Sequence, residues 1–129
     1  MDHIFFVTVT RIATPSLEVQ LINRLRMRRD IRRTPIFGLG RAAGVGGLGC
    51  AADYLRAYPE QIAMLVSVEL CSLTLQRTDT LITNMIASGL FGDGAAAVIM
   101  RGAELAGNQR PQIIDSGSIV YPDSERALG

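Results

Sequence analysis

The chain has 129 residues, of which 48% are hydrophobic, and its formal net charge at pH 7 is +1. This length and composition fit one small globular domain and exclude a disordered chain. The near-neutral charge gives no general reason to expect nucleic acid or an anionic membrane as a partner.

A strand and a helix are the first elements that the sequence predicts. Residues 4–10 (IFFVTVT) are β-branched and aromatic, which predicts a strand buried over most of its length. Pro15 then opens a helix that Ser16 can cap. The apolar residues of this helix that share one face at helical spacing are Leu17, Leu21, Ile22 and Leu25.

An arginine-rich segment follows this helix. Six arginines crowd around Asp30 in residues 24–33 (RLRMRRDIRR). Such a run is ordinarily a solvated connection, and the alternative interpretation is a phosphate-binding edge.

A second predicted strand, residues 34–39 (TPIFGL), leads into a helix that carries Arg41 and Cys50. This helix contains four glycines before Tyr58, and each costs about 0.8–1 kcal/mol relative to alanine. Packing must therefore hold the helix, and we expect it to lie buried between two layers. Its larger contacts are predicted to come from Val45, Leu48, Ala52 and Leu55.

The second half of the chain begins with a predicted strand and a predicted helix. Residues 62–70 (IAMLVSVEL) form the continuous apolar run of a strand inside a parallel sheet. Residues 78–91 predict an amphipathic helix. Its inner face comprises Leu81, Met85 and Ile86.

Two more strands are predicted after a turn at Asp93 and Gly94: a fourth that ends at Met100, and a fifth over residues 111–122, interrupted by Gly117. Strands that alternate with helices indicate an α/β fold with a mostly parallel sheet. Residues 1–129 contain no linker that would divide them, so a single domain is expected.

The amino end bears on the location of the protein, and the cysteine and histidine content bears on disulfides and metal sites. The first apolar run is short and follows an acidic residue, so neither a signal peptide nor a membrane span is expected. Two cysteines and the single histidine, His3, are too few for a disulfide framework or a metal site. We expect a cytoplasmic protein without a bound metal.

Three stretches of the sequence carry a family resemblance. PIFGLG with the small-residue helix after it, then VELCSLTLQRTDT, then ASGLFGDGAAAVI, resemble the central part of a bacterial type III polyketide synthase of the chalcone synthase-like family, within the thiolase-like superfamily. The resemblance extends over essentially the whole chain but over only about a third of a family subunit. The chain therefore looks like an incomplete thiolase-like domain.

This resemblance implies a fold and a reaction. The family fold stacks α-β-α-β-α layers from two similar halves, and this chain would supply most of the first half. In the family, a cysteine takes an acyl group from a coenzyme A thioester, and a decarboxylating malonyl unit then extends it by Claisen condensation. The implied partners are acyl-coenzyme A, malonyl-coenzyme A and a second subunit of a homodimer, with no other cofactor.

Five positions match family residues other than the nucleophile. Phe91 matches the phenylalanine between the coenzyme A tunnel and the active cavity, and Cys71 and Thr74 match positions that line the cavity. Glu69 matches a buried acid beside them, and Thr14 matches the residue that reaches into the partner's cavity. Simpler interpretations are a core residue for Phe91, an inert thiol for Cys71, a turn residue for Thr14 and a helix cap for Glu69.

The nucleophile position departs from the family. A strand that ends in a tight glycine turn exposes the next residue at the amino end of a helix, where a thiolate is stabilised. Arg41 stands there, and a guanidinium is not nucleophilic. Cys50 lies nine residues on, which turns its side chain through about 900° and moves it roughly 13 Å along the helix. An alternative register, with residues 47–50 as the turn, leaves too little helix before Pro59.

Other departures point the same way. Arg11 stands where the family usually has glycine, and Arg26 stands where it usually has Gly-Leu. The histidine and asparagine that complete the family site are expected to be absent, because His3 lies in the wrong place and the second half of a family subunit is missing. We therefore expect this chain alone to form no acyl-enzyme.

Two other functions remain as alternatives. GLGRAA satisfies the G-x-G-x-x-G/A fingerprint of an NAD(P)-binding domain, and Glu69 ends the following strand, where a ribose-binding acid would lie. The second alternative is a noncatalytic half-subunit that pairs with itself or with an intact synthase.

Overall fold

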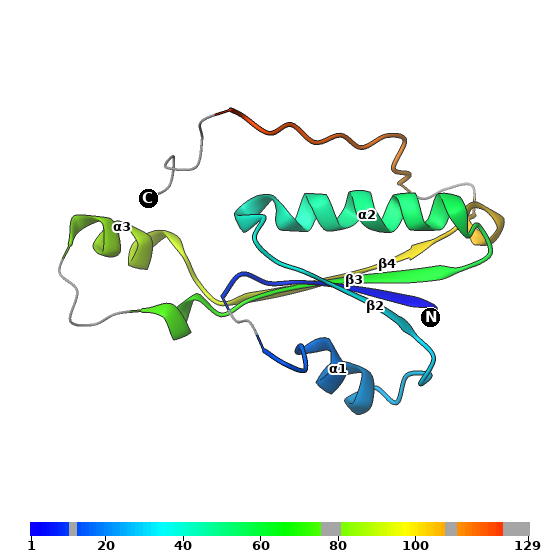
Figure 1. The fold of residues 1–129 in the computed structure, drawn as a ribbon, viewed down its shortest axis with the longest axis horizontal. Helices are drawn as coiled ribbons and strands as arrows, with labels where there is room; N and C mark the ends of the chain where they lie inside the picture. The colour runs from blue at the N-terminus through cyan, green and yellow to red at the C-terminus, as the bar shows by residue number, and fades with distance from the viewer. Residues whose placement is uncertain (11–12, 76–80, 108–110, 123–129) are drawn as a thin grey trace.

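The computed structural model describes residues 1–10, 13–75, 81–107 and 111–122 (Figure 1). Its strands form one sheet in the order β2-β1-β3-β4. They are β1 (His3–Val7), β2 (Arg32–Ile36), β3 (Ile62–Glu69) and β4 (Gly94–Arg101). β1 runs parallel to β2 and β3, whereas β4 is antiparallel to β3. The predicted α/β fold with a mostly parallel sheet is confirmed.

The helices lie on both faces of this sheet and beyond one end of it (Figure 1). α1 (Glu18–Arg24) covers one face, and α2 (Ala43–Ala57) covers the opposite face. α3 (Ile82–Leu90) lies past the end of β3. The short 3-10 turns are η1 (Gly40–Ala42), η2 (Cys71–Thr74) and η3 (Ala103–Leu105).

The central strand β1 is buried on both faces, which accounts for its continuous apolar sequence. Phe5 and Val7 face α2 and pack with Leu55 and Leu65. Ile4 and Phe6 face the other way and belong to the cluster that contains Ile22 of α1. Because successive strand residues point to opposite faces, covering both faces requires apolar residues at every position.

Close packing holds the glycine-rich helix α2 on the sheet. A Cβ atom added at Gly47 would lie 2.7 Å from Leu65 Cδ1 and 3.1 Å from Val7 Cγ2. A side chain at this position would require Leu65 and Val7 to shift, so glycine allows the closest approach. The buried inner face that the sequence predicted for this helix is therefore present.

The outer face of α2 is less covered than expected. Residues 111–122 run along it (Figure 1), and Arg56 Nη2 donates to the Ile114 carbonyl at 2.9 Å. Val45 is nevertheless 75% exposed, so its predicted packing contact is wrong. A single extended segment is too narrow to cover a whole helix face.

Two expectations for the first helix are wrong. α1 begins at Glu18, and Ser16 donates its hydroxyl to the Glu18 carboxylate at 2.5 Å instead of capping a backbone N–H. Ile22 is buried as predicted, but Leu25 is 57% exposed because the helix ends there and the chain turns away.

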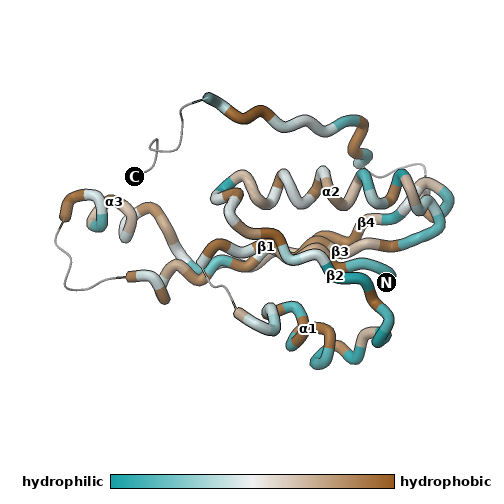
Figure 2. The backbone as a smooth tube through the Cα atoms, in the orientation of Figure 1, coloured by the Kyte–Doolittle hydropathy of each residue, from teal (hydrophilic) through white to brown (hydrophobic). Residues whose placement is uncertain are grey.

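The predicted inner face of α3 is also wrong among the described residues. Leu81, Met85 and Ile86 are 68%, 62% and 55% exposed. α3 lies beyond the sheet, so no core is beneath it, and its apolar residues stand out in Figure 2. The part of the predicted helix at residues 78–80 lies outside the described residues.

The fifth predicted strand is absent. Residues 111–122 form no ladder and lie over α2 instead of beside the sheet. Ile114 and Val120 are 89% and 86% exposed. Their alternating apolar pattern is that of a strand, but the described residues provide no neighbouring strand for it.

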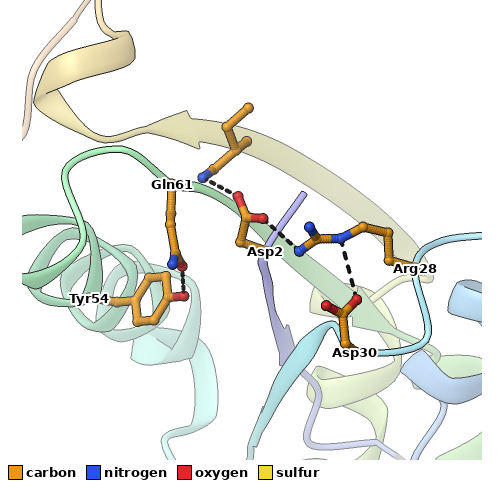
Figure 3. A network of polar contacts seen from close by, with 6 residues as sticks. Asp2, Arg28, Asp30, Tyr54 and Gln61 are labelled. Atoms are coloured by element: carbon orange, nitrogen blue, oxygen red, sulfur yellow. Dashed lines mark hydrogen bonds and ion pairs between the residues drawn. The ribbon is translucent and has the colours of Figure 1, made fainter.

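A polar network closes the end of the sheet at which β1 begins (Figure 3). Asp2 Oδ2 accepts the Ile62 N–H at 2.8 Å, and Asp2 Oδ1 pairs with Arg28 at 2.7 Å. Arg28 also pairs with Asp30 at 3.4 Å. The Ile62 N–H lowers the pKa of Asp2, and the charge of Arg28 lowers it further. Part of the arginine-rich segment is thus tied to the fold by acids.

Candidate functional site

Most of the residues that the sequence singled out lie at one edge of the sheet. The parallel strands β1, β2 and β3 end at this edge, and β4 begins there. Ligands of α/β sheets characteristically bind outside the carboxyl ends of the strands. The loops at this edge are therefore the candidate site.

Arg41 lies at the amino end of α2, at the tip of a glycine turn. β2 ends at Ile36, and Gly38 and Gly40 have φ angles of +87° and +54°, a conformation that glycine adopts freely. These two residues reverse the chain so that η1 can feed directly into α2. The Arg41 side chain is exposed and pairs with no acid among the described residues.

The guanidinium of Arg41 lies over the aromatic ring of Phe91, with its Cζ atom 4.1 Å from the ring centroid. Phe91 follows α3 directly and is 37% exposed. This distance is well within the range of a cation–π interaction. The structure therefore brings together the position predicted for the nucleophile and the predicted cavity phenylalanine.

Phe91 also lines a pocket of about 290 Å³ between η2 and α3. Cys71 and Thr74 line the same pocket, so three of the predicted site residues share it. The remaining lining residues are Ser72, Leu75, Asn84, Ala87, Ser88, Gly92 and Asp93. A pocket of this size with hydroxyl, thiol and aromatic groups suits a small organic group.

Asp93 is a site residue that the sequence reasoning missed. Its carboxylate accepts the Ser72 N–H at 2.8 Å and the Ser72 hydroxyl at 2.6 Å. These two hydrogen bonds lower the pKa of Asp93, since they stabilise the ionised form. They fix η2 against the start of β4. The Asp-Gly pair predicted only a turn, because a partner 21 positions away leaves no local signal.

Glu69 lies beside the pocket but has a different contact. Its carboxylate accepts the Val9 N–H at 3.0 and 3.3 Å, and the next residue, Leu70, donates its N–H to Thr10 Oγ1 at 2.8 Å. Glu69 is half-buried. It therefore joins the ends of β1 and β3 and caps no helix.

Thr14 and Cys50 lie apart from the pocket. Thr14 is exposed on the loop after β1, directly before Pro15, and it does not line the pocket. Cys50 is exposed on α2 and does not line the pocket either. This placement agrees with the helical rotation that points Cys50 away from the tip.

The strand order does not support the dinucleotide alternative. In that fold the acid for the ribose follows the strand next to the phosphate-binding turn. Here β1 lies between β2 and β3, which separates the GLGRAA turn from the strand of Glu69 by two interstrand spacings, about 9–10 Å. The Glu69 carboxylate is also occupied by Val9.

The described residues contain neither a metal-binding cluster nor a membrane-spanning helix. No group of three or more histidine, cysteine or acidic side chains in this part of the chain is arranged to hold a metal ion. None of the helices in it has the length and apolar character needed to cross a bilayer.

Comparison with known proteins gives consistent matches. A family model described as FAE1/type III polyketide synthase-like protein matches residues 3–111. A 1,3,6,8-tetrahydroxynaphthalene synthase of Streptomyces peucetius subsp. caesius is 46% identical over 131 residues, which cover 100% of this chain and 34% of that protein. A putative chalcone synthase of Bacillus subtilis is 42% identical over 135 residues, with 100% and 37% covered.

A solved structure agrees with these relatives. The crystal structure of 1,3,6,8-tetrahydroxynaphthalene synthase from Streptomyces coelicolor A3(2), a bacterial type III polyketide synthase, superposes with a TM-score of 0.88 at 38% identity. The match covers 97% of this chain and 35% of that chain. The chain thus spans about a third of the length of the curated relatives it matches.

Proposed function

The chain belongs to the FAE1/type III polyketide synthase-like family, and from this membership we propose that it supplies part of the acyl cavity of such a synthase without supplying the nucleophile. Its sheet has the thiolase-like arrangement of the synthase structures. The observation that carries the proposal is the Arg41 guanidinium at the tip of the glycine turn, in contact with Phe91. The proposed reaction of the complete enzyme is acyl transfer from coenzyme A thioesters and extension with malonyl-coenzyme A.

In this proposal Phe91, Cys71 and Thr74 contact the acyl group. They share one pocket and present an aromatic ring, a thiol and a hydroxyl to it. Arg41 offers a positive charge to an anionic substrate at the mouth of this pocket, but it forms no thioester, because a guanidinium stays protonated. No cofactor beyond the coenzyme A thioesters is proposed.

The covalent step provides the test. The chain is incubated with acyl-coenzyme A thioesters and analysed by intact mass, in parallel with the variant Arg41→Cys. We expect no adduct on the unaltered chain and an acyl adduct at position 41 of the variant. A stable adduct mapped to Cys50 of the unaltered chain would contradict the assignment of position 41.

Binding without reaction is measured separately. We expect acyl-coenzyme A or malonyl-coenzyme A to raise the melting temperature of the chain, since a ligand that binds the folded state stabilises it. NAD(P) serves as the comparison, and stabilisation by NAD(P) alone would favour the dinucleotide alternative.

The proposed partner is a further part of a synthase, either a second copy of the chain or the carboxyl-terminal half. The apolar residues of α3 and of residues 111–122 support this proposal, since Ile82, Leu90 and Ile114 are 73%, 71% and 89% exposed. Exposed apolar surface of this extent is characteristic of protein–protein contacts. Such a noncatalytic half-subunit role is compatible with Arg41, and a cytoplasmic location is part of the same proposal.

Light scattering after size exclusion tests the pairing. We expect a dimer, or a complex with a separately expressed carboxyl-terminal half of a relative. Thr14 is exposed and available to a partner, and the variant Thr14→Ala is expected to weaken the pairing. A well-behaved monomer that binds no hydrophobic dye would contradict the proposal.

A further inference from the structure

A second groove lies on the other face of the sheet, between α1 and β2. Its volume is about 680 Å³. It adjoins the face covered by α1 and the amino end of β2, whereas Arg41 and Phe91 lie at the carboxyl ends of the strands, where α2 begins. The groove is therefore separate from the candidate site described above.

The lining of this groove combines an apolar floor with a cationic rim. Ile22 and Ile31 are buried and belong to the core cluster under α1, and Met27 packs against the same cluster. The complete lining consists of Val19, Ile22, Asn23, Arg26, Met27, Arg29, Ile31 and Arg33. No acidic side chain lines the groove in the part of the chain that the structure describes.

The arginines of the rim differ from their neighbours in how they are paired. Arg28 is paired with Asp2 and Asp30, and Arg32 lies over the ring of Tyr58 at 4.8 Å. Neither of these two arginines lines the groove. Arg28 is thus neutralised by acids, and the guanidinium of Arg32 is engaged by an aromatic ring.

Arg26 and Arg29 have no acidic partner among the described residues. Arg33 lies 3.7 Å from the carboxylate of Glu18, which is fully buried behind the groove. One of the Glu18 oxygens, Oε2, has no hydrogen-bond partner in the described structure. The groove therefore presents two uncompensated guanidinium groups and a third that a buried carboxylate anchors.

The backbone at Arg26 gives an independent indication. Arg26 has a φ angle of +51°, in the left-handed region that favours glycine. It follows the end of α1, where the Met27 N–H reaches back to the Ile22 carbonyl at 3.0 Å, as in the helix-ending turn that usually contains glycine. An arginine at this glycine-favouring position places a guanidinium in the groove at a cost in backbone strain.

We propose that this groove binds a small amphiphilic anion: a phosphate or carboxylate group attached to an acyl chain. Arg26 and Arg29 pair with the oxyanion, since guanidinium groups match phosphate and carboxylate geometry. The acyl chain lies on Ile22, Met27 and Ile31. The volume of the groove falls within the range of small-molecule sites.

Decyl phosphate is the probe for this site. Binding to the 129-residue chain is measured by titration calorimetry, with decyl phosphate below its micelle-forming concentration. Inorganic phosphate carries the charge alone and decanol carries the chain alone, and we expect each to bind at least about tenfold more weakly than decyl phosphate.

The variant with both Arg26→Gly and Arg29→Gln tests the assignment to residues. We expect decyl phosphate to bind this variant at least about tenfold more weakly, because two charge-assisted hydrogen-bond donors are removed. Glycine adopts the left-handed backbone conformation of position 26 without strain, so Arg26→Gly is not expected to destabilise the fold. A loss of binding in this variant is then not due to unfolding. Arg24→Gln is the matched control: Arg24 lies in the same segment but outside the groove lining, and we expect a change of less than about twofold.

Several outcomes would overturn the proposal. Equal losses of decyl phosphate affinity in the double variant and in Arg24→Gln would mean that the anion is attracted to the basic segment as a whole and not to the groove. Equal binding of decyl phosphate and inorganic phosphate would exclude a role for the apolar floor. Binding to vesicles that contain phosphatidic acid, without binding of free decyl phosphate, would assign the arginines to a lipid surface instead of a small ligand.

Discussion

Arg41 and Phe91 join η1, which leads into α2, to the end of α3 through a guanidinium that lies 4.1 Å from the ring centroid. Fifty residues separate them in the sequence. α3 stands beyond the sheet (Figure 1), and this contact connects its end to the turn before α2. The contact therefore has measurable consequences for stability and for chemistry.

The first prediction concerns the strength of this contact. A double-mutant cycle of Arg41→Gln and Phe91→Leu, measured by urea unfolding, is expected to give a coupling free energy of about 0.5–1 kcal/mol, the range for exposed cation–π pairs. Arg56→Gln combined with Phe91→Leu is the control, because Arg56 contacts Asp53 and Ile114 instead. Additive effects of Arg41→Gln and Phe91→Leu would mean that the ring and the guanidinium do not interact in solution.

The second prediction concerns thiol reactivity at the tip of the glycine turn. In Arg41→Cys, the new thiol lies at the amino end of α2, where the helix dipole lowers a thiol pKa. At pH 7 each unit of lowering speeds alkylation about threefold, after allowance for the weaker nucleophile. Mass spectrometry after a timed exposure to iodoacetamide compares this position with the exposed Cys50. A rate at position 41 no higher than the rate at Cys50 would contradict the placement.

The third prediction uses two glycines of α2 as a matched pair. Gly47→Ala is expected to lower the free energy of unfolding by about 1 kcal/mol, since overpacking against Leu65 and Val7 outweighs the better helix propensity. Gly44→Ala places its Cβ in open space and is expected to raise the free energy of unfolding by up to about 1 kcal/mol. Chemical denaturation measures both, and effects of the same sign would contradict the close approach at Gly47.

The fourth prediction is a dependence of stability on pH through His3. Burial lowers the pKa of His3, and the positive charge of Arg32 lowers it further. Because the unfolded state then binds a proton more readily, stability is complete above the unfolded pKa of about 6.5 and falls as the pH decreases below it. The imidazole stacks on Phe5 at 4.2 Å, so His3→Phe keeps an aromatic ring there. We expect unfolding measured between pH 7.5 and 5 to show a shallower slope in His3→Phe, and an unchanged slope would exclude His3 as the source.

The sequence was sufficient to predict the sheet because burial on both faces leaves a simple pattern. The apolar runs around Phe5 and Leu65 needed no partner residues to be recognised, and the glycines after β2 indicated the turn that exposes Arg41. The observed strands are nevertheless shifted at their ends, since β1 ends at Val7 and β2 begins at Arg32. Where a strand stops depends on its neighbours as well as on its own residues.

The pattern of apolar residues did not predict which of them are covered by another helix or strand. Leu81 and Met85 have the spacing of a buried helix face, and Ile114 and Val120 have that of a strand, yet all four are exposed. Periodicity reports which side chains favour burial, whereas burial itself requires another element opposite them. The contacts of Asp93 with Ser72 and of Arg41 with Phe91 were missed for a related reason, because each joins residues that only the tertiary fold brings together.

The two outer strands of the sheet differ in how readily another copy can extend it. β2 carries two arginines and Pro35, residues that discourage pairing at a sheet margin, whereas β4 reads GAAAVIMR and has no proline. If two molecules paired through their β4 edge strands, only the β2 strands, which carry the arginines, would remain at the edges of the joined sheet. Strand addition of this kind would stop at a pair, and a substitution that removed Pro35 and its neighbouring charges would allow such a pair to grow into fibres.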